Sequence, residues 1–341
     1  MYTGAEARGD RREDQERHSA AGRRTGRRHP VLATLAALVL AGLSVPLAVR
    51  AAGSDGVTPV PQLLAFLPWF LAPTWLALLG AALARRPLLL VWGLAVLAAT
   101  GWFLQPYGST APDGAAGRQG KAQFRVLTSN LQRGGALPDL LETVRRERPQ
   151  IVSIQECDSA CADALRTPEL RKAYPHRVIA DGRPAEGSAL LSVYPLGEKS
   201  EVPARLAMPG AVAKIGGEEV RLQVAHPMPP DLGELGPWRT ELGRLRSYAA
   251  SGGDRPTLIA GDFNSSADHA AFRAVLDTGL HDTARMLGQS RTPTWPATTA
   301  PPLGTQIDHV LVSRQLVPLE AKFLDFAGTD HRALLVDLKL F

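Results

Sequence analysis

The sequence predicts a mixed, layered α/β domain that follows three transmembrane helices. Two observations carry this prediction. Residues 31–104 are almost free of charge, whereas the chain from Lys121 onward has the composition of an ordinary globular protein. In that second part, short apolar strands alternate with segments whose apolar residues recur at helical spacing, which is the pattern of a layered α/β fold.

Three uncharged apolar segments precede the globular part, at about residues 31–49, 60–84 and 87–104. Each has close to the roughly 20 residues that cross the hydrocarbon core of a bilayer. Buried core helices are an alternative reading of all three, and a cleaved signal peptide is an alternative for the first. Three such segments in succession favour transmembrane helices over the residue range 31–106.

Arginine residues set the expected orientation. Residues 1–30 form a basic tail with eight arginines, and Arg85 and Arg86 separate the second apolar segment from the third. Positively charged flanks stay on the cytoplasmic side of a membrane. We therefore expect a multi-pass protein of the cell membrane, with a cytoplasmic N-terminus and an extracytoplasmic C-terminal domain. Cleavage of the first segment would not change the side on which that domain lies.

The net charge of +5 is no sign of a nucleic-acid-binding surface. Residues 121–341 contain 26 Lys and Arg and 26 Asp and Glu, so the globular domain is formally neutral. Residues 107–120, rich in Gly, Pro and Ala, predict a linker. The two cysteines, Cys157 and Cys161, leave two readings open: a disulfide, which an extracytoplasmic location permits, or small buried residues.

Within the globular part, apolar runs and period-two alternation predict strands, and apolar residues at helical spacing predict helices. The predicted strands are residues 124–130, 150–156, 187–196, 220–226, 257–264, 306–313 and 331–340. The predicted helices are residues 137–149, 238–250 and 268–280. This alternation assigns residues 121–341 to one α/β domain.

Polar side chains recur where these strands begin or end. They are Asn130, Glu156, His226, Asp262, Asn264, Asp308, His309, Asp330 and His331. Each alone has an ordinary explanation as a turn residue, a surface carboxylate or a buried histidine, but layered folds build their sites from polar groups that converge at strand ends. Carboxylates and carboxamides without thiolates suit Mg²⁺, or alternatively Mn²⁺. A histidine paired with an aspartate suits proton transfer.

Seven motifs carry a resemblance to a known family: "SNLQRG", "IQECD", "GSALLSVYPL", "AHPMPP", "AGDFNSS", "IDHVLVS" and "GTDHRALLVDL". In order and spacing they resemble the motifs of the endonuclease/exonuclease/phosphatase superfamily, which has the DNase I-like fold. The resemblance covers residues 123–341. It implies a four-layer α/β sandwich, in which two packed β-sheets are flanked by helices. It also implies divalent-metal-dependent hydrolysis of phosphoesters by in-line attack of water.

The resemblance further implies which side chains hold the metal. Glu156 would bind the ion, Asn130 would contact metal-bound water or phosphate beside it, and Asp330 would assist at the metal. His309 follows a motif residue at a position where the family varies, so we interpret it as structural.

The catalytic roles follow from the same resemblance. Asp262 would orient or deprotonate the attacking water, and Asn264 would hydrogen-bond the phosphoryl oxygen as charge develops. His331, oriented by Asp308, would contact the phosphate or act as a base. His226 matches the remaining histidine of the family, the candidate general acid, although "AHPMPP" is a loose version of that motif.

Several substrates remain open at this point, because the fold alone does not select one. We expect a phosphodiesterase or nuclease first. The alternatives are a phospholipid-headgroup hydrolase of the sphingomyelinase or phosphoinositide phosphatase type, and a non-catalytic membrane-tethered binding module. The expected partners are the phosphoester substrate (nucleic acid or a phospholipid headgroup) and the lipid bilayer; no protein partner is predicted.

Overall fold

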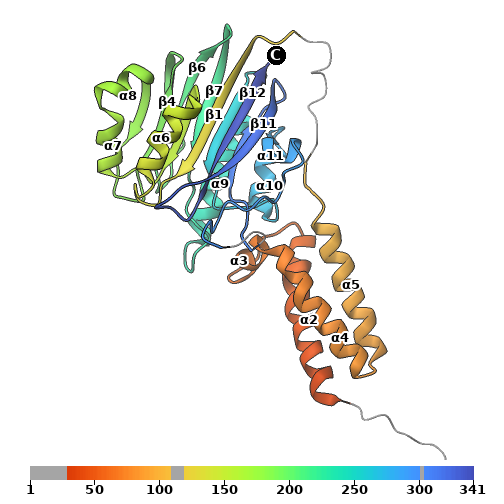
Figure 1. Cartoon of the computed structure of the whole chain (residues 1–341). Coiled ribbons are helices and arrows are strands. Elements are labelled where there is room, and N and C mark those ends of the chain that lie inside the picture. Colours follow the sequence, from red (N-terminus) through yellow and green to blue (C-terminus); the bar gives the residue numbers. More distant parts are fainter. Residues whose placement is uncertain (1–28, 109–118, 300–302) are drawn as a thin grey trace, which may run out of the picture.

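The computed structural model describes residues 29–108, 119–299 and 303–341. The predicted basic tail and most of the predicted linker lie outside these residues. Two parts follow one another along the chain (Figure 1). We call residues 30–104 the helical unit and residues 121–341 the sandwich domain.

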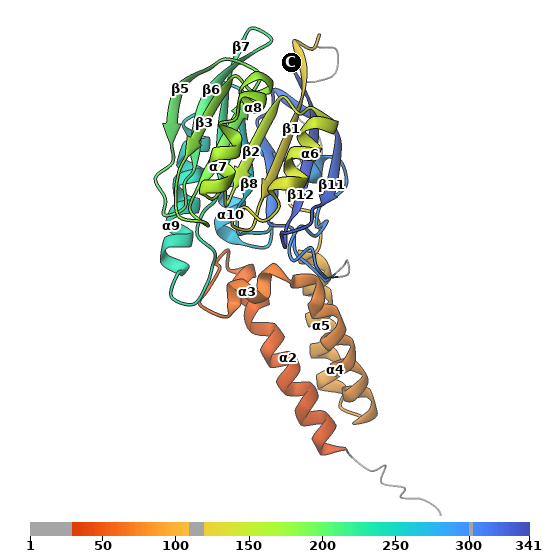
Figure 2. The same ribbon diagram turned by 60° about the vertical axis from the view of Figure 1, so that its left-hand side comes forward.

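Two six-stranded sheets pack face to face in the sandwich domain (Figures 1 and 2). The first has the strand order β11-β12-β1-β2-β4-β3 and the second has the order β5-β6-β7-β8-β10-β9. In each sheet one parallel pair, β1 with β2 or β7 with β8, lies at the centre, and the other described pairings are antiparallel. The strands are β1 (Ala122–Asn130), β2 (Ile151–Gln155), β3 (His176–Ala180), β4 (Ser188–Ser192), β5 (Leu196–Glu201), β6 (Pro209–Ile215), β7 (Glu218–Ala225), β8 (Thr257–Asp262), β9 (His281–Asp282), β10 (Asp308–Val312), β11 (Leu316–Asp325) and β12 (Arg332–Leu340).

Helices cover the outer faces of both sheets. One apolar core lies between the sheets, a second lies between the first sheet and α6 and α7, and a third lies between the second sheet and α9 and α10. The helices of this domain are α6 (Leu137–Glu147), α7 (Ser159–Leu165), α8 (Pro168–Ala173), α9 (Leu235–Ala250), α10 (Ala270–Leu276) and α11 (Thr283–Met286). The layered α/β prediction is thus confirmed as two packed sheets flanked by helices.

The predicted strand over residues 187–196 is too long. β4 ends at Ser192, whose Oγ accepts a hydrogen bond from the backbone N–H of Tyr194 at 2.9 Å, and this turn precedes Pro195. The chain then crosses to the other sheet, where Leu196 begins β5.

The helical unit consists of α2 (Pro30–Ala51), α3 (Val60–Ala65), the 3₁₀ helix η1 (Leu67–Phe70), α4 (Leu71–Leu83) and α5 (Pro87–Phe103). The prediction of one span over residues 60–84 is wrong. Pro61 and Pro68 lie in the first turns of α3 and η1, where a missing backbone N–H is tolerated, so the segment is divided into short helices.

Among the described helices, α2 alone combines the length and the apolar composition of a membrane span. Its 22 residues rise about 33 Å. The 17 residues of α5 rise only about 26 Å, less than a hydrocarbon core of roughly 30 Å. Helix lengths therefore give one candidate span instead of the three predicted.

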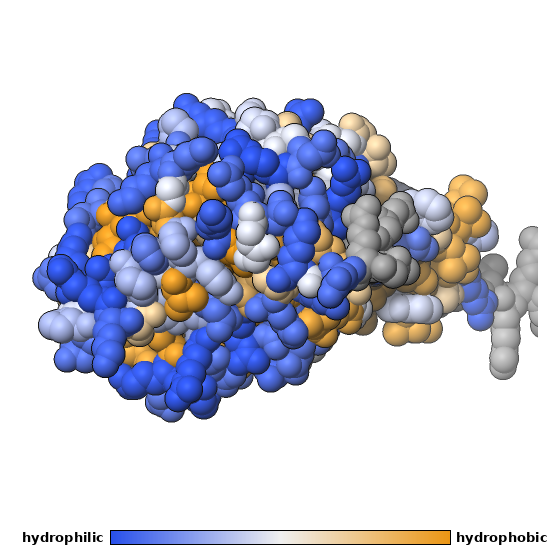
Figure 3. All heavy atoms as spheres, turned by 90° about the horizontal axis from the view of Figure 1, so that it is seen from above, coloured by the Kyte–Doolittle hydropathy of each residue, from blue (hydrophilic) through white to orange (hydrophobic). Residues whose placement is uncertain are grey.

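Large apolar side chains are nevertheless exposed along the helical unit. Trp75, Leu76, Leu79, Leu88 and Leu94 are each more than half exposed. Seen from above, the sandwich domain is mainly hydrophilic with smaller hydrophobic areas, and hydrophobic side chains are prominent on the helical unit (Figure 3). Exposed apolar side chains in this number are typical of a membrane or protein contact.

A buried ionic cluster fastens the helical unit to the sandwich domain. Asp268, which has no exposed surface in its side chain, lies 3.1 Å from Nη2 of Arg50 and accepts a hydrogen bond from Nη2 of Arg291 at 2.8 Å. Arg291 also donates to the carbonyl oxygen of Phe103 at 3.0 Å. Arg50 lies in the last turn of α2. Its side chain therefore joins the end of this helix to Asp268 of the sandwich domain.

The loop between α2 and α3 makes a second attachment. The carboxylate of Asp55 accepts hydrogen bonds from the backbone N–H groups of Ala270 and Ala271, at 2.6 and 3.0 Å, and so satisfies the first turn of α10. The helical unit and the sandwich domain are thus joined by specific buried contacts.

Cys157 and Cys161 form a disulfide, which selects one of the two readings left open by the sequence. The bridge lies at the start of α7, where the side chain of Asp158 accepts a hydrogen bond from the N–H of Cys161 at 2.8 Å.

Candidate active site

The strand ends that the sequence singled out meet at one edge of the sandwich. In the first sheet, β1 and β2 run parallel, so Asn130 and Glu156 emerge at the same edge. In the second sheet, Asp308 at the start of β10 is the register partner of Asp262 at the end of β8. Because the sheets pack face to face, the two pairs lie opposite each other.

Asn130 links the two sheets. Its Nδ2 donates to Oε1 of Glu156 at 3.2 Å and to Oδ2 of Asp262 at 3.0 Å. Its Oδ1 accepts from the backbone N–H of Gln132 at 2.9 Å. Both ends of the amide are therefore engaged, and Asn130 holds the two carboxylates in place.

Two residues of the site have backbone angles that side chains rarely adopt. Glu156 has φ of 53° and Asn264 has φ of 46°. Such left-handed conformations at non-glycine residues cost on the order of 1–3 kcal/mol and cluster at functional sites. Gly261, just before the catalytic candidates, is required for a different reason: a Cβ there would lie 2.0 Å from the carbonyl oxygen of Ala225 on β7.

His331 lies between two carboxylates. Its Nδ1 is 2.9 Å from Oδ2 of Asp308, and its Nε2 is 3.8 Å from Oδ2 of Asp262. Burial alone would lower the pKa of His331, but Asp308 and Asp262 together raise it to about 10. The imidazole therefore carries a proton at neutral pH. Burial raises the pKa of Asp262 to about 7, although His331 acts against this.

Asp330 and Asn264 are held by neighbours that the sequence did not single out. Oδ2 of Asp330 accepts from Nε1 of Trp295 at 2.8 Å. The backbone N–H of Asn264 donates to Oδ1 of Asp262 at 2.7 Å, and its Nδ2 donates to the carbonyl oxygen of Pro227 at 2.9 Å. These bonds fix the orientation of both side chains.

His226 lines the same cleft but differs from His331 in its surroundings. It is fully buried, its Nδ1 has no hydrogen-bond partner among the described residues, and burial lowers its pKa to about 3. A neutral imidazole donates one hydrogen bond but lacks the extra proton of an imidazolium. The predicted role as general acid thus requires that His226 acquire a proton during the reaction, and it stays a prediction.

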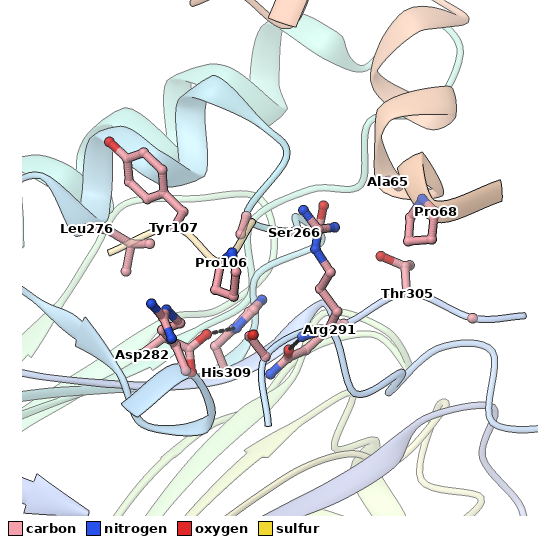
Figure 4. A pocket seen from close by; sticks show the side chains of 15 residues that line it. Ala65, Pro68, Pro106, Tyr107, Ser266, Leu276, Asp282, Arg291, Thr305 and His309 are labelled. Carbon is pink, nitrogen blue, oxygen red and sulfur yellow. Dashed lines mark hydrogen bonds and ion pairs between the residues drawn. The ribbon is translucent and has the colours of Figure 1, made fainter. Parts of the chain in front are cut away.

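His309 does not belong to the site. Its Nδ1 is 2.7 Å from Oδ2 of Asp282 (Figure 4). Its Nε2 is 3.0 Å from the carbonyl oxygen of Ser265. Its ring packs against Phe263 and Phe272. Our interpretation of His309 as structural agrees with these contacts.

The candidate side chains open into a cleft of about 990 Å³. Among the described residues, it is lined by Gln62, Ala65, Phe66, Gln132, Arg133, Glu156, Ala185, Leu206, His226, Met228, Pro229, Pro230, Asp231, Asp262, Asn264, His269, Trp295, Thr305, Ile307, Asp330 and His331. Asn130 and Asp308 lie behind this surface and contact its lining residues. The structure therefore brings all eight predicted site residues together.

The donor set of the site fits a hard divalent cation. Glu156 and Asp330 supply carboxylate oxygens, and Oδ1 of Asp308 is buried without a hydrogen-bond partner in the described part of the chain. Asp262, Asp308 and His331 lie with one ligand-type atom each within 4.8 Å of the others, but a protonated imidazole has no free lone pair for a cation, so the carboxylates are the candidate ligands. Oxygen-rich sites of this kind suit Mg²⁺ or Mn²⁺.

Comparison with protein families gives one match. A sequence model described as "Endonuclease/Exonuclease/phosphatase family" matches residues 127–331, which is more than half of the chain. The comparison with curated proteins found no match.

Solved structures share the fold at low sequence identity. TDP2 of D. rerio, complexed with a single-strand DNA product, is 14% identical, with a TM-score of 0.53, over 64% of this chain and 99% of that chain. An endonuclease/exonuclease/phosphatase of Beutenbergia cavernae is 19% identical, with a TM-score of 0.52, over 64% and 72% of the two chains. The 3′ phosphatase NExo of Neisseria, bound to a product DNA hairpin, is 17% identical, with a TM-score of 0.52, over 62% and 98%.

Proposed function

Because the chain belongs to the endonuclease/exonuclease/phosphatase family, and is therefore a phosphoric ester hydrolase, we propose that it cleaves its substrate by metal-dependent, in-line attack of water. The substrate class that we favour is a phosphodiester, as for a phosphodiesterase or nuclease. The observation that carries the proposal is the arrangement of Asp262, His331 and Asp308 beside Asn130 and Glu156 at one cleft.

Asp262 activates the water in this proposal. Its carboxylate is held from two sides, by the N–H of Asn264 and by Nδ2 of Asn130. A pKa of about 7 suits a general base that works near neutral pH. Burial makes the carboxylate a stronger base than an exposed aspartate, because the charged form is poorly solvated.

His331 stabilises negative charge on the phosphoryl group. Asp308 orients the ring through Nδ1, which leaves Nε2 as the donor on the side of Asp262. Asn264 and the neutral His226 provide further hydrogen-bond donors along the cleft. Donors fixed before the reaction lower the barrier because they need no reorganisation as charge develops.

Glu156 and Asp330 would hold Mg²⁺ or Mn²⁺, with Asn130 fixing the orientation of Glu156. The ion would neutralise negative charge on the phosphate and on the departing oxygen. The backbone N–H of Arg133 also donates to Oε2 of Glu156 at 3.0 Å, so the carboxylate is preorganised on both oxygens.

Two observations bear on the substrate. The TDP2 and NExo structures are complexes with DNA products, which favours a nucleic-acid phosphoester. A phospholipid-headgroup hydrolase is the second candidate. Arg133 is the single guanidinium among the described lining residues of the cleft, against four carboxylates. This charge balance suits a single headgroup phosphate better than a polynucleotide, which needs several cationic contacts. A non-catalytic binding module is disfavoured, since every side chain that the mechanism uses is present.

Metal removal tests the mechanism. We expect the full chain to lose all turnover of bis(para-nitrophenyl) phosphate in EDTA and to regain it with Mg²⁺ or Mn²⁺, because the anionic carboxylates of the cleft repel the phosphate unless a bound cation offsets their charge. Glu156→Gln should raise the metal concentration that gives half-maximal activity, whereas Glu201→Gln, exposed on β5, should not. Undiminished activity in EDTA would overturn the proposal.

We also propose that α2 anchors the protein in a membrane with the sandwich domain outside the cytoplasm. The apolar length of α2, the arginines of residues 1–30 and the disulfide support this placement. Protease added to intact cells is expected to digest the sandwich domain while a cytoplasmic marker survives. Complete protection of the domain would contradict the placement.

A further inference from the structure

One wall of the catalytic cleft comes from the helical unit. Gln62 and Ala65 of α3, with Phe66 directly after it, line the cleft together with Asp262 and His331. The helical unit is therefore more than a tether, because it supplies surface to the active site itself.

Specific contacts hold this wall in place. The side-chain amide of Gln62 donates to the carbonyl oxygen of Pro230, and the carbonyl oxygen of Pro61 lies 2.9 Å from Nε2 of His269. The ring of Phe66 lies 6.2 Å from the ring of Trp295, measured between centroids, and Trp295 donates to the site carboxylate of Asp330. Trp295 thus lies between Phe66 and the site carboxylate of Asp330.

The same segment borders a second cavity of about 250 Å³ (Figure 4). Ala65 and Pro68 lie on one side of it, facing Thr305 and Arg291 of the sandwich domain. Ala65 and Thr305 also line the catalytic cleft. Ala65, Phe66 and Pro68 therefore each line a cavity, whereas Leu67 between them is buried in the core of the helical unit.

The lining of the cleft is chemically divided. One part carries the site carboxylates of Glu156, Asp262 and Asp330 beside His331, and Arg133 is the single guanidinium among the described lining residues. This part suits one phosphoryl group and a cation. A polynucleotide strand needs several phosphate contacts along a basic groove. The remaining wall is largely apolar and is formed by Ala65, Phe66, Leu206, Met228, Pro229 and Ile307.

The position of the wall matters because α3 lies where the helical unit meets the sandwich domain (Figures 1 and 2). If α2 anchors the chain, the cleft opens beside the surface of the bilayer. A substrate with an apolar chain would reach Phe66 along that surface, whereas a soluble polyanion gains nothing from this wall.

We infer that Gln62, Ala65 and Phe66 form a substrate-binding wall that selects phosphoesters carrying an apolar chain, such as amphiphilic lipid phosphodiesters. This inference rests on the proposed hydrolase function. It makes Phe66 a specificity-determining residue, which contacts the apolar substituent while the phosphoryl group lies against His331 and Asp262.

The experiment measures hydrolysis of two phosphodiesters that differ only in their alkyl chain, dodecyl para-nitrophenyl phosphate and ethyl para-nitrophenyl phosphate. The full chain is assayed in detergent with Mg²⁺. We expect the native chain to favour the dodecyl ester in kcat/KM, and Phe66→Ala to reduce this preference about tenfold, since an apolar contact of this size is lost. Leu63→Ala is the matched control, because Leu63 lies on α3, is 43% exposed and does not line the cleft. It should keep the native preference.

Two other outcomes would contradict the proposed function and the inference about the wall, respectively. If neither ester is turned over with metal, the proposed function fails. If both are turned over and Phe66→Ala keeps the native dodecyl-to-ethyl ratio, or a single-stranded oligonucleotide is the best substrate of the native chain, the inference about the wall is overturned while the hydrolase function stands.

Discussion

Replacing Asp262 by asparagine is expected to lower kcat/KM about a thousandfold, the usual contribution of a positioned general base. Asparagine keeps the shape of the side chain, and its oxygen still accepts from a neighbouring donor, but it does not take a proton from water. Asp231→Asn is the matched control, because Asp231 lines the same cleft and is exposed at its rim. Full turnover by Asp262→Asn would show that another group activates the water.

The pH profile gives a second readout of the same residue. The pKa of Asp262 is raised to about 7, so its carboxylate form, the base, is depleted as the pH falls below that value. We expect kcat/KM of the native chain to fall with decreasing pH through about pH 7. The unfolding temperatures of Asp262→Asn and Asp231→Asn, measured by circular dichroism, show whether a loss of activity comes from the chemistry or from loss of the fold.

Replacing Asp268 by asparagine is expected to lower the free energy of unfolding of the full chain by about 3–5 kcal/mol, because two guanidinium groups lose their buried counterion. For a chain of this size the change corresponds to a decrease in Tm of roughly 10 °C, measurable by thermal unfolding in detergent. Asp268 holds Arg50 of the helical unit and Arg291 of the sandwich domain at once. The loss should therefore also loosen the junction between the two parts.

An exposed ion pair provides the control for this prediction. Asp254 lies 2.8 Å from Arg314, but the side chains are 93% and 66% exposed. Solvent-exposed pairs contribute little to stability, so Asp254→Asn should leave Tm nearly unchanged. Equal effects of the two substitutions would show that burial of Asp268 is not what matters.

The sequence predicted the parts of the fold whose burial follows a simple period. β1, β2, β7, β8, β10 and β12 are buried along most of their length, so their apolar runs were visible. The predicted strands miss β3, β5, β6, β9 and β11, of which β6 is mostly buried and β3 and β11 are partly buried. β5 (Leu196–Glu201) is a mostly exposed edge strand, and β9 has only two residues. Neither β5 nor β9 shows an apolar pattern, because each is held by hydrogen bonds to one neighbouring strand and not by burial of its side chains.

The candidate site divides in the same way. Asn130 and Asp262 were predictable because each directly follows a buried apolar run and ends its strand. Trp295, which holds Asp330, lies in a loop without a period, so nothing in its surroundings pointed to the site. Phe66 was assigned to a membrane span because its neighbours are apolar. Only the folded chain shows that Phe66 faces the cleft.

The two sheets have the same internal plan, a central parallel pair with antiparallel strands on both sides, and this likeness has a consequence for catalysis. In the proposed mechanism the two sheets divide the chemistry between them: Asn130 and Glu156 come from the central pair of one, and His226 and Asp262 come from the central pair of the other. Neither half holds a complete catalytic set. With these assignments we expect a partly synthesised or partly folded chain to have no phosphoesterase activity, and activity to arise only once the two similar sheets have packed together.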